Sequence, residues 1–319
     1  MEEETESAAQ LKVVYRGDKY NVAPFASKHP AGALVLERVA GKCIDRLFDG
    51  EEELDGLRHK HSQNAHRILQ TYCLDKENCA GKDEVIDLEK PVVCQVWRLG
   101  DSYWDWIHQP VDRDLRMFES DFLEYFSRTK WFVIPLVWLP LVVVLCIGGL
   151  SSFASRLKSS GNAACALALL FVCGMVSWTL IEYALHRFAF HWHPDPRSPR
   201  MITLHFVLHG LHHKTPMDKD RLVFPPVLAS AFVFLFYLLF SWLLPWAVCL
   251  SFSSGNLFGY VCYDLIHYYL HHGRPPPNSL RHKRKLYHHA HHFKQFDAGY
   301  GISTALWDHV FGTVDPNVC

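Results

Sequence analysis

The sequence of 319 residues lacks, or has few of, three features from which a protein's class is often inferred: a dinucleotide-binding motif, an apolar N-terminal segment and carboxylates in its second part. It contains no GxGxxG or other dinucleotide motif, so we do not expect the chain to bind NADPH itself. Its acidic start, MEEETESAAQ, has no apolar stretch, so we expect no secretory signal and a cytosolic N-terminus. Carboxylates are scarce after Glu124, where only eight of the 33 acidic residues lie, so few of them are available to a metal site there.

Charge and hydropathy divide the chain into two unlike parts. Residues 1–124 hold 25 of the 33 acidic and 16 of the 32 basic residues, a net charge of about −9, and the remainder carries about +8. Apolar runs occupy residues 131–150, 163–181, 227–250 and, more weakly, 257–270. The first three are long enough to cross a bilayer of roughly 30 Å as helices, and the fourth comes close when it starts near Ser253. We therefore predict four transmembrane helices.

The basic residues indicate how these helices are oriented. Four crossings return segments 182–226 and 271–319 to the side of the N-terminus. Each of these segments carries six Lys or Arg residues, whereas the intervening turns, 151–162 and 251–254, carry two and none. Since cytoplasmic loops are enriched in Lys and Arg, we expect both termini and both basic segments to be cytosolic.

Histidine is the most informative residue type in the second part. Of 21 histidines, 16 lie between His186 and His309, most of them in four clusters: HRFAFH (186–191), HGLHH (209–213), HYYLHH (267–272) and HHAHH (288–292). Three of the clusters contain histidines four residues apart, which places both rings on one face of a helix, where they can bind one metal ion. His186 and His191 are five apart, so that pair requires a helix end, a distortion or two different ions.

The position of the clusters predicts one shared metal site. Each cluster lies at the cytosolic end of an apolar run or just beyond it, where polar side chains are costly unless they serve a function. Imidazole suits Fe, Zn, Cu and Ni, so the ligand type alone does not select the metal. Ten imidazoles supply about five for each of two ions, which leaves one open coordination position at each ion if both are octahedral.

Residues 11–75 read as a small α+β unit, with short strands in LKVVYRG and DKYNVAPF and helices around 31–39 and 61–72. The stretches KHPAGALVLERVAGKCIDRLFDG and HKHSQNAHRIL resemble the cytochrome b5 family. The resemblance implies that His29 and His61 are the two axial ligands of a b-type haem, with His59 and His66 as neighbouring alternatives to His61. A haem with two histidine ligands transfers electrons and does not bind O₂. The sequence departs from the family at Ala31, at Cys43 and in the inserted EEELDGLR.

The histidine clusters, in this order between apolar runs, resemble the integral-membrane sterol desaturase and fatty acid hydroxylase superfamily, which uses a non-haem di-iron centre with O₂. The resemblance implies the following ligands: His186, His191, His209, His212, His213, His267, His271, His288, His291 and His292. His289 is an alternative to His288, and His193, His205 and His272 are held in reserve. Iron is inferred from the oxygen chemistry, and zinc is the alternative occupant of the same nitrogen sites in purified protein. Glu182 and Asp264, next to ligands, are expected to accept a ligand's second N–H.

The stretches YWDWIHQPV, MITLHFVLHGLHHKTPMDKDRLVFPPV and GYGISTALWDHVFGT extend the likeness to the branch of this superfamily with a fused b5 domain, the fatty acid 2-hydroxylases. The implied fold is an α+β cytochrome b5-like domain (1–80), a linker (81–125) and an all-α integral membrane domain (126–319) with four transmembrane helices and a cytosolic histidine-rich helical cap. The implied reaction is O₂-dependent 2-hydroxylation of fatty acyl chains for sphingolipid synthesis. Its expected partners are a fatty acyl or ceramide substrate, membrane lipids of the endoplasmic reticulum and a separate NAD(P)H-dependent cytochrome b5 or P450-type reductase, with no nucleic acid.

Other interpretations stay open at this point. A sterol desaturase or methyl oxidase of the same superfamily has the same clusters but usually relies on a separate b5 protein. A membrane metal transporter would place its ligands near the middle of the membrane. A b5-type electron carrier with a membrane anchor leaves the clusters unexplained. The basic run RHKRK (281–285) is either a docking patch for the haem unit or a contact for lipid headgroups.

Overall fold

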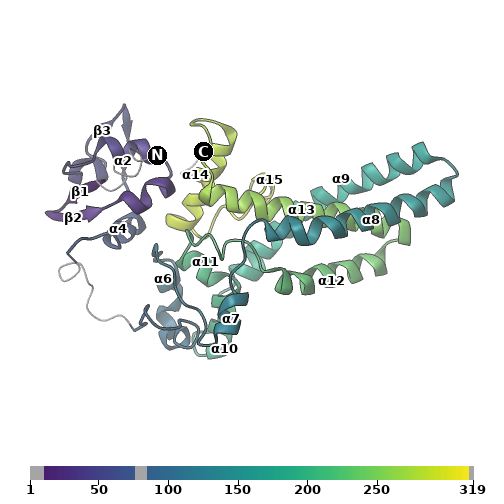
Figure 1. Ribbon diagram of the computed structural model, residues 1–319, viewed down its shortest axis with the longest axis horizontal. Coiled ribbons are helices and arrows are strands. Elements are labelled where there is room, and N and C mark those ends of the chain that lie inside the picture. Colours follow the sequence, from purple (N-terminus) through teal and green to yellow (C-terminus); the bar gives the residue numbers. More distant parts are fainter. Residues whose placement is uncertain (1–10, 76–84, 316–319) are drawn as a thin grey trace.

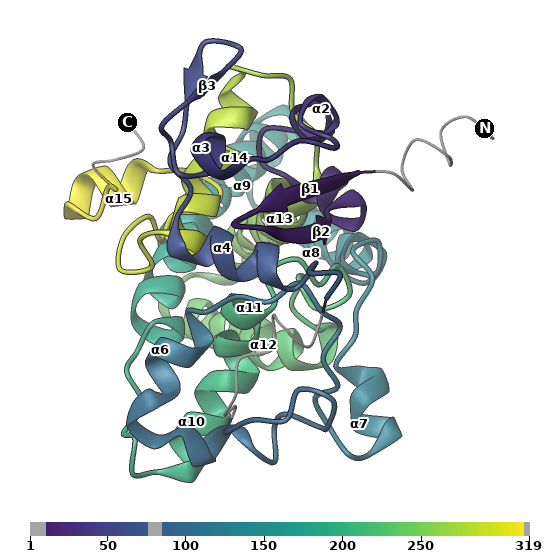
Figure 2. The ribbon, with the colours of Figure 1, turned by 90° about the vertical axis from the view of Figure 1, so that its left-hand side faces the viewer.

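The computed structural model describes residues 11–75 and 85–315, and the molecule is elongated. A small N-terminal unit lies at one end, four long helices extend to the other, and the short histidine-bearing helices lie between them (Figure 1). Seen from the N-terminal end, this unit covers the ends of α13 and α14 (Figure 2).

The N-terminal unit, residues 11–75, contains the predicted strands and helices. Strand β1 (Lys12–Tyr15) pairs antiparallel with β2 (Asp18–Asn21) through a turn at Arg16 and Gly17. Both turn residues have positive φ, 50° and 87°, the conformation that fits the twist of a two-residue hairpin. The remaining elements are η1 (Ala23–Lys28), α2 (Ala33–Arg38), α3 (Asp45–Phe48), β3 (Glu53–Leu54), β4 (Leu57–Arg58) and α4 (Gln63–Gln70). One apolar core joins them, including Val13, Tyr15 and Tyr20.

The stretch expected to be a linker, 81–125, is folded against the rest of the chain over its described part. Helices η2 (Val96–Ser102), α6 (Tyr103–Ile107) and α7 (Asp121–Phe126) lie in it. Val92, Val96 and Ile107 are fully buried together with Ile202 and Phe206 of the histidine-bearing region. These apolar contacts fix the segment in place beside α10 (Pro199–His205), so it is part of the layer that carries the histidines.

Three helices are long and apolar enough to cross a membrane: α8 (Val133–Leu157), α9 (Ser160–Ala184) with its continuation to Phe190, and α12 (Pro226–Leu243). Their outward side chains include exposed Leu136, Val144 and Leu235, which suits contact with lipid. The fourth helix, α13 (Trp246–His272), packs against all three and is buried along most of its length. It has 27 residues but is less apolar, with buried Ser251, Ser254 and Asn256.

The structure corrects the boundary of the third apolar run. Residues 227–250 were expected to form one crossing, with a turn at 251–254. Helix α12 instead ends at Leu243, and the chain turns at Leu244 and Pro245 before α13 begins at Trp246. Pro245 cannot donate a backbone hydrogen bond and disfavours a helical conformation in the residue before it, which explains the break. Of the four expected spans, three therefore satisfy length and hydropathy in the described residues, and the third apolar run ends seven residues earlier than predicted.

The histidine-bearing elements cover the end of the helical bundle that faces the N-terminal unit. They are η3 (Leu185–Phe190), α10, η4 (Phe206–Gly210), α11 (Leu211–Lys214), α14 (Leu280–Phe293) and α15 (Leu306–Phe311). Figure 1 shows α11 and α14 between the N-terminal unit and the long helices.

Two glycines allow α9 and α13 to pack closely. A Cβ atom on Gly255 would lie 1.9 Å from the backbone oxygen of Phe171, and one on Gly174 would lie 2.1 Å from the oxygen of Phe252. Real Cβ atoms do not approach so closely, so any side chain at either position would push the two helices apart. Since α9 leads to His186 and α13 carries His267 and His271, this contact also sets the spacing of the histidines.

We expect Gly255→Ala to destabilise the protein by about 1–3 kcal/mol, because the added methyl group overpacks a contact between two backbones. Gly161→Ala is the matched control, since a Cβ at Gly161, near the start of α9, meets nothing within 4 Å. The measurement is thermal unfolding of the purified protein in detergent. Equal unfolding midpoints for the two variants would contradict the proposed role of the glycine contact.

Candidate metal and haem sites

The spacing of His186 and His191 is explained by a π-helical turn. Residues Leu185–Phe190 form a π-helix, and the His191 N–H donates to the His186 carbonyl at 3.0 Å, an i to i+5 bond. This wider turn places residues five apart on one side, whereas an ideal α-helix would direct them apart. A second π-helical turn, Phe206–Gly210, carries His209. Both distortions occur at histidines, which fits the frequent use of π-bulges at functional sites.

Five histidine rings from three separate segments converge in a first group. Its members, hereafter group 1, are His186, His191, His209, His213 and His291. The Nε2 atom of His209 lies 3.2 Å from those of His186 and His191 and 3.0 Å from that of His213. The His291 Nε2 lies 3.1 Å from that of His191. Two ligands bound at right angles about 2.1 Å from an ion would be separated by roughly 3.0 Å, so these spacings match adjacent corners of an octahedral site.

The second group, hereafter group 2, has the same composition: His212, His267, His271, His288 and His292. The Nε2 of His288 lies 2.8 Å from that of His271 and 3.1 Å from that of His292. In the described part of the chain, the Nε2 atoms of His212 and His267 are buried without a hydrogen-bond partner. Unpaired buried nitrogens cost free energy, and a bound cation would remove that cost.

The two groups lie against each other. The rings of His213 in group 1 and His292 in group 2 have centroids 4.6 Å apart. Burial lowers the pKa of His212 to about 3 and holds the pKa values of His213 and His292 well below the usual range. These imidazoles are therefore neutral at pH 7 and present lone pairs, the form in which histidine binds metals. All ten histidines expected to bind metal belong to one group or the other.

The structure also separates the adjacent histidines that the sequence left ambiguous. His288 belongs to group 2, whereas the His289 Nε2 lies 3.1 Å from the carbonyl oxygen of Leu270 and is directed away from the group. Of the reserve histidines, His205 bonds the Tyr103 hydroxyl at 2.6 Å and His193 stacks on Trp104. His193, His205 and His272 lie outside both groups.

Backbone carbonyls of one C-terminal loop orient two rings of group 1. His186 Nδ1 donates to the Tyr300 carbonyl at 2.6 Å, and His291 Nδ1 donates to the Ala298 carbonyl at 2.8 Å. These bonds fix the tautomer and direct each Nε2 lone pair into the group. The expected partner of His186, Glu182, instead accepts from the N–H groups of Ile302 and Ser303.

Sequence reasoning missed a second carboxylate that holds this loop. Asp308 is fully buried and accepts from the N–H groups of Tyr300 and Gly301, each at 2.9 Å. Its only sequence signal was its place in the stretch GYGISTALWDHVFGT. Asp264, expected beside His267, lies 3.4 Å from the Phe224 backbone nitrogen. Both predicted carboxylates and Asp308 therefore accept from backbone N–H groups near the site, and within residues 11–75 and 85–315 neither Glu182 nor Asp264 bonds a ligand imidazole.

Two apolar cavities meet beside the histidine groups. Cavity 1, of about 480 Å³, lies among the long helices and is lined by Trp138, Trp178, Phe240 and Tyr260. Cavity 2, of about 550 Å³, is lined by His209, His212 and His267 and by aromatic residues of α7. Phe190, Phe224 and Tyr263 line both cavities. An apolar molecule in this space would thus lie next to both groups.

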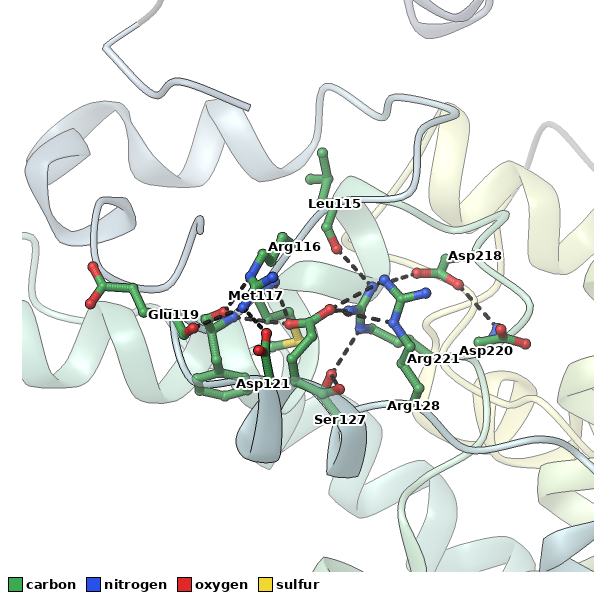
Figure 3. Close-up of polar contacts among 12 residues, drawn as sticks. Leu115, Arg116, Met117, Glu119, Asp121, Ser127, Arg128, Asp218, Asp220 and Arg221 are labelled. Atoms are coloured by element: carbon green, nitrogen blue, oxygen red, sulfur yellow. Dashed lines mark hydrogen bonds and ion pairs between the residues drawn. The ribbon is translucent and has the colours of Figure 1, made fainter. Parts of the chain in front are cut away.

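A buried arginine anchors α7 beside cavity 2 (Figure 3). The Arg221 side chain is 4% exposed and donates to the Leu115 carbonyl at 2.8 Å and to Asp218 at 2.9 Å. It also pairs with Glu124 of α7 and donates to the Ser127 hydroxyl. These charge-assisted bonds hold a helix whose exposed side chains, Phe122, Leu123, Tyr125 and Phe126, are apolar or aromatic.

The N-terminal unit brings together the two histidines expected to bind haem. The ring centroids of His29 and His61 are 6.5 Å apart. Two imidazoles that bind one iron from opposite sides, with bonds of about 2 Å, have ring centres roughly 6 Å apart, so this spacing fits. The Nδ1 of His61 lies 3.2 Å from the Phe48 carbonyl oxygen, which leaves its Nε2 for a ligand bond. His66 is engaged with Tyr15 and the Ser62 carbonyl.

Comparison with known proteins identifies close relatives. The fatty acid hydroxylase family model matches residues 171–313, which include all ten histidines of the two groups. Fatty acid 2-hydroxylase of Rattus norvegicus is 40% identical, over 93% of this chain and 89% of the rat protein. Dihydroceramide fatty acyl 2-hydroxylase FAH2 of Arabidopsis thaliana is 45% identical, over 72% of this chain and 93% of its own. A solved structure, full-length Scs7p with only the hydroxylase domain visible, matches with a TM-score of 0.67 and 38% identity, over 84% of this chain and 97% of its own.

We expect Asp308→Asn to weaken metal retention by about 10- to 100-fold, the range typical of residues that orient metal ligands. The amide nitrogen would face a backbone N–H where a carboxylate oxygen now accepts, so the loop that orients His186 and His291 would shift. Metal content is measured by mass spectrometry after dialysis against graded chelator. Asp297→Asn is the control, because Asp297 is exposed and eleven residues away. Equal retention in both variants would argue against the loop's role.

Proposed function

Because this chain belongs to the fatty acid hydroxylase family, we propose that it hydroxylates carbon 2 of a fatty acyl chain with O₂. In the balanced reaction, R–CH₂–CO–X, O₂, two electrons and two protons give R–CHOH–CO–X and water. Relatives named fatty acid 2-hydroxylase and dihydroceramide fatty acyl 2-hydroxylase support this assignment. The observation that carries it is the pair of five-histidine groups beside two apolar cavities.

The two groups would each hold one iron ion. Nitrogen spacings of about 3 Å, neutral rings and unpaired buried nitrogens favour a bound cation, although zinc fits the same donor set. Each group would hold its ion through five imidazole nitrogens, a donor set with room for one further ligand. The metal pair supplies the oxidising power needed to break an unactivated C–H bond, which acid–base side chains cannot do.

The chain's own residues would position the substrate and exclude water. The acyl chain lies in cavity 1 among Trp138, Trp178 and Phe240, and its polar end reaches the shared wall at Phe190 and Tyr263. Carbon 2 is then next to the histidine groups, while the group X occupies cavity 2. For a ceramide, cavity 2 would also receive the second chain. Apolar linings hold water away from the reacting carbon.

The N-terminal unit would supply electrons. His29 and His61 would hold a b-type haem in a cytochrome b5-like domain spanning 1–80, and a separate NAD(P)H-dependent reductase would reduce it. The ring spacing and the pKa of His61, which burial and nearby positive charge lower to about 3, support ligation by neutral imidazoles. Such a haem transfers one electron at a time, and two transfers complete each turnover.

The membrane arrangement is also a proposal. Residues 126–319 would form the membrane domain, in the endoplasmic reticulum, with α13 as a fourth crossing shielded from lipid by α8, α9 and α12. The 27 residues of α13 span about 40 Å at 1.5 Å each, enough for a bilayer. Four crossings then leave both termini, the N-terminal unit and the histidine groups on the cytosolic side.

The alternatives receive less support. The relatives reported above are fatty acyl hydroxylases, which disfavours a sterol desaturase or methyl oxidase. A metal transporter needs a polar path through the membrane, whereas the cavity among the long helices is lined mainly by apolar and aromatic residues. A simple haem carrier would need neither histidine group.

Removing one ligand from each centre separates the two roles. We expect His29→Ala to lose haem and keep its metal, and His213→Ala to lose metal and keep its haem. Both should lose 2-hydroxylated sphingolipids, measured by mass spectrometry after expression in cells without their own enzyme. His309→Ala, an exposed histidine outside both groups, should retain activity. Wild-type activity in His213→Ala would exclude the metal site proposed here.

Filling cavity 1 should change chain-length selection without changing the reaction. Ser253 is buried and lines this cavity, so Ser253→Phe shortens the space for the acyl chain. The 2-hydroxylated products should shift toward shorter chains, as read from the same lipid profiles. Ser241→Phe adds the same ring at an exposed position of α12 and should leave the profile unchanged. An unchanged distribution in Ser253→Phe would place the acyl chain elsewhere.

A further inference from the structure

The N-terminal unit is joined to the rest of the chain by a buried ionic contact centred on Asp112. Lys28, at the end of η1, donates to both carboxylate oxygens of Asp112 at 2.6 and 2.8 Å. The Tyr72 hydroxyl, just after α4, donates to the same carboxylate. The Asp112 side chain is only 6% exposed, so one carboxylate receives two separate parts of the N-terminal unit.

A second contact joins the N-terminal unit to the end of α14. Asn64 of α4 is buried and donates to the Phe293 carbonyl, at the end of α14, at 3.3 Å. Arg67 in turn donates to the Asn64 side chain at 2.9 Å, which fixes the orientation of the amide. Because the N-terminal unit is bonded to two different segments, at Asp112 and at Phe293, the two contacts define its orientation and not merely its proximity.

In this orientation, the part of the N-terminal unit next to His29 lies against α13, the helix that carries His267 and His271 of group 2. Lys285 is buried and donates to the carbonyl oxygens of His271 and Gly273, at the C-terminus of α13. Helix η1, which ends one residue before His29, packs against α13 directly. On α14, the His289 ring lies 5.6 Å from that of His271 in group 2, centroid to centroid.

We propose that Asp112 is a positioning residue for electron transfer. By accepting hydrogen bonds from Lys28 and Tyr72, it acts as a latch that holds the part of the N-terminal unit around His29 against α13 and α14, which carry four of the five histidines of group 2. The inference rests on the proposed function. Each transfer moves one electron from a ferrous haem, which becomes ferric, to one ferric ion of the metal pair, which becomes ferrous. The separate NAD(P)H-dependent reductase then restores the ferrous haem.

Burial makes the contact at Asp112 costly to break. A carboxylate that is removed from water is costly unless it is paired, and removing one partner of such a buried pair leaves an uncompensated charge. Burial and the Asp112 charge both raise the pKa of Tyr72, so its hydroxyl stays protonated and acts as a donor. In the basic run 281–285, Lys285 donates to the carbonyls of His271 and Gly273 and Arg284 to those of Gly301 and Ile302, so both side chains bond within the histidine-bearing region.

The test compares the full-length wild type with three variants, each loaded with haem and metal. They are Asp112→Ala, Asp114→Ala and the double charge swap that combines Lys28→Asp and Asp112→Lys. Asp114 is an exposed carboxylate two residues from the latch and serves as the control. Stopped-flow absorbance follows haem reduction by the reductase and then haem reoxidation after O₂ and substrate lipid are added. Hydrogen exchange of the 63–67 and 289–294 amides reports docking without reference to either cofactor.

In Asp112→Ala we expect unchanged haem content and an unchanged rate of haem reduction, with faster hydrogen exchange in both segments. Haem reoxidation should slow by at least about tenfold, because a loss of about 1.4 kcal/mol in docking lowers the docked population about tenfold. The charge swap should recover most of the rate, and Asp114→Ala should match the wild type. Unchanged hydrogen exchange or unchanged reoxidation in Asp112→Ala overturns the latch. Substrate-independent reoxidation in the wild type instead refutes the proposed function.

Discussion

The structure depends on bringing ten neutral imidazoles close together in a buried space. Nitrogen lone pairs about 3 Å apart repel one another unless a cation lies between them, so the histidine groups define where positive charge is needed. The surrounding architecture serves this constraint. Two π-helical turns aim the rings, glycines bring α9 and α13 close together, and the C-terminal loop supplies carbonyls to the outer nitrogens.

Helical periodicity is local, so the sequence could pair histidines that share a helix face but could not assign the ten histidines to two groups. Histidines four apart, such as His209 and His213, must share a helix face, and the structure places both in group 1. The pair His186 and His191 showed that a distortion was needed but not which kind. The choice between His288 and His289 was open because the side chains of adjacent helical residues point in different directions from the same helix. The packing of α14 against α13 decides which of the two rings faces group 2.

Other features could not be predicted because they depend on distant backbone. A carboxylate was expected beside His186, but the carbonyl of Tyr300, 114 residues away, takes that place. Nothing in the composition of 81–125 distinguishes a linker from the packed segment observed from residue 86 onward.

The early end of α12, by contrast, could have been predicted, since Pro245 interrupts the third apolar run. Hydropathy alone concealed it because Trp, Ala and Val follow the proline.

The division of ligands between the two groups has a consequence for how a metal pair would load. Neighbouring residues serve different groups: His212 belongs to group 2 and His213 to group 1, and on α14 His291 belongs to group 1 while His288 and His292 belong to group 2. The first ion to bind would immobilise backbone that also carries ligands of the second. Much of the ordering entropy of the second site would then already have been lost, so occupancy should be cooperative, and half-loaded molecules should be a minority at any metal concentration.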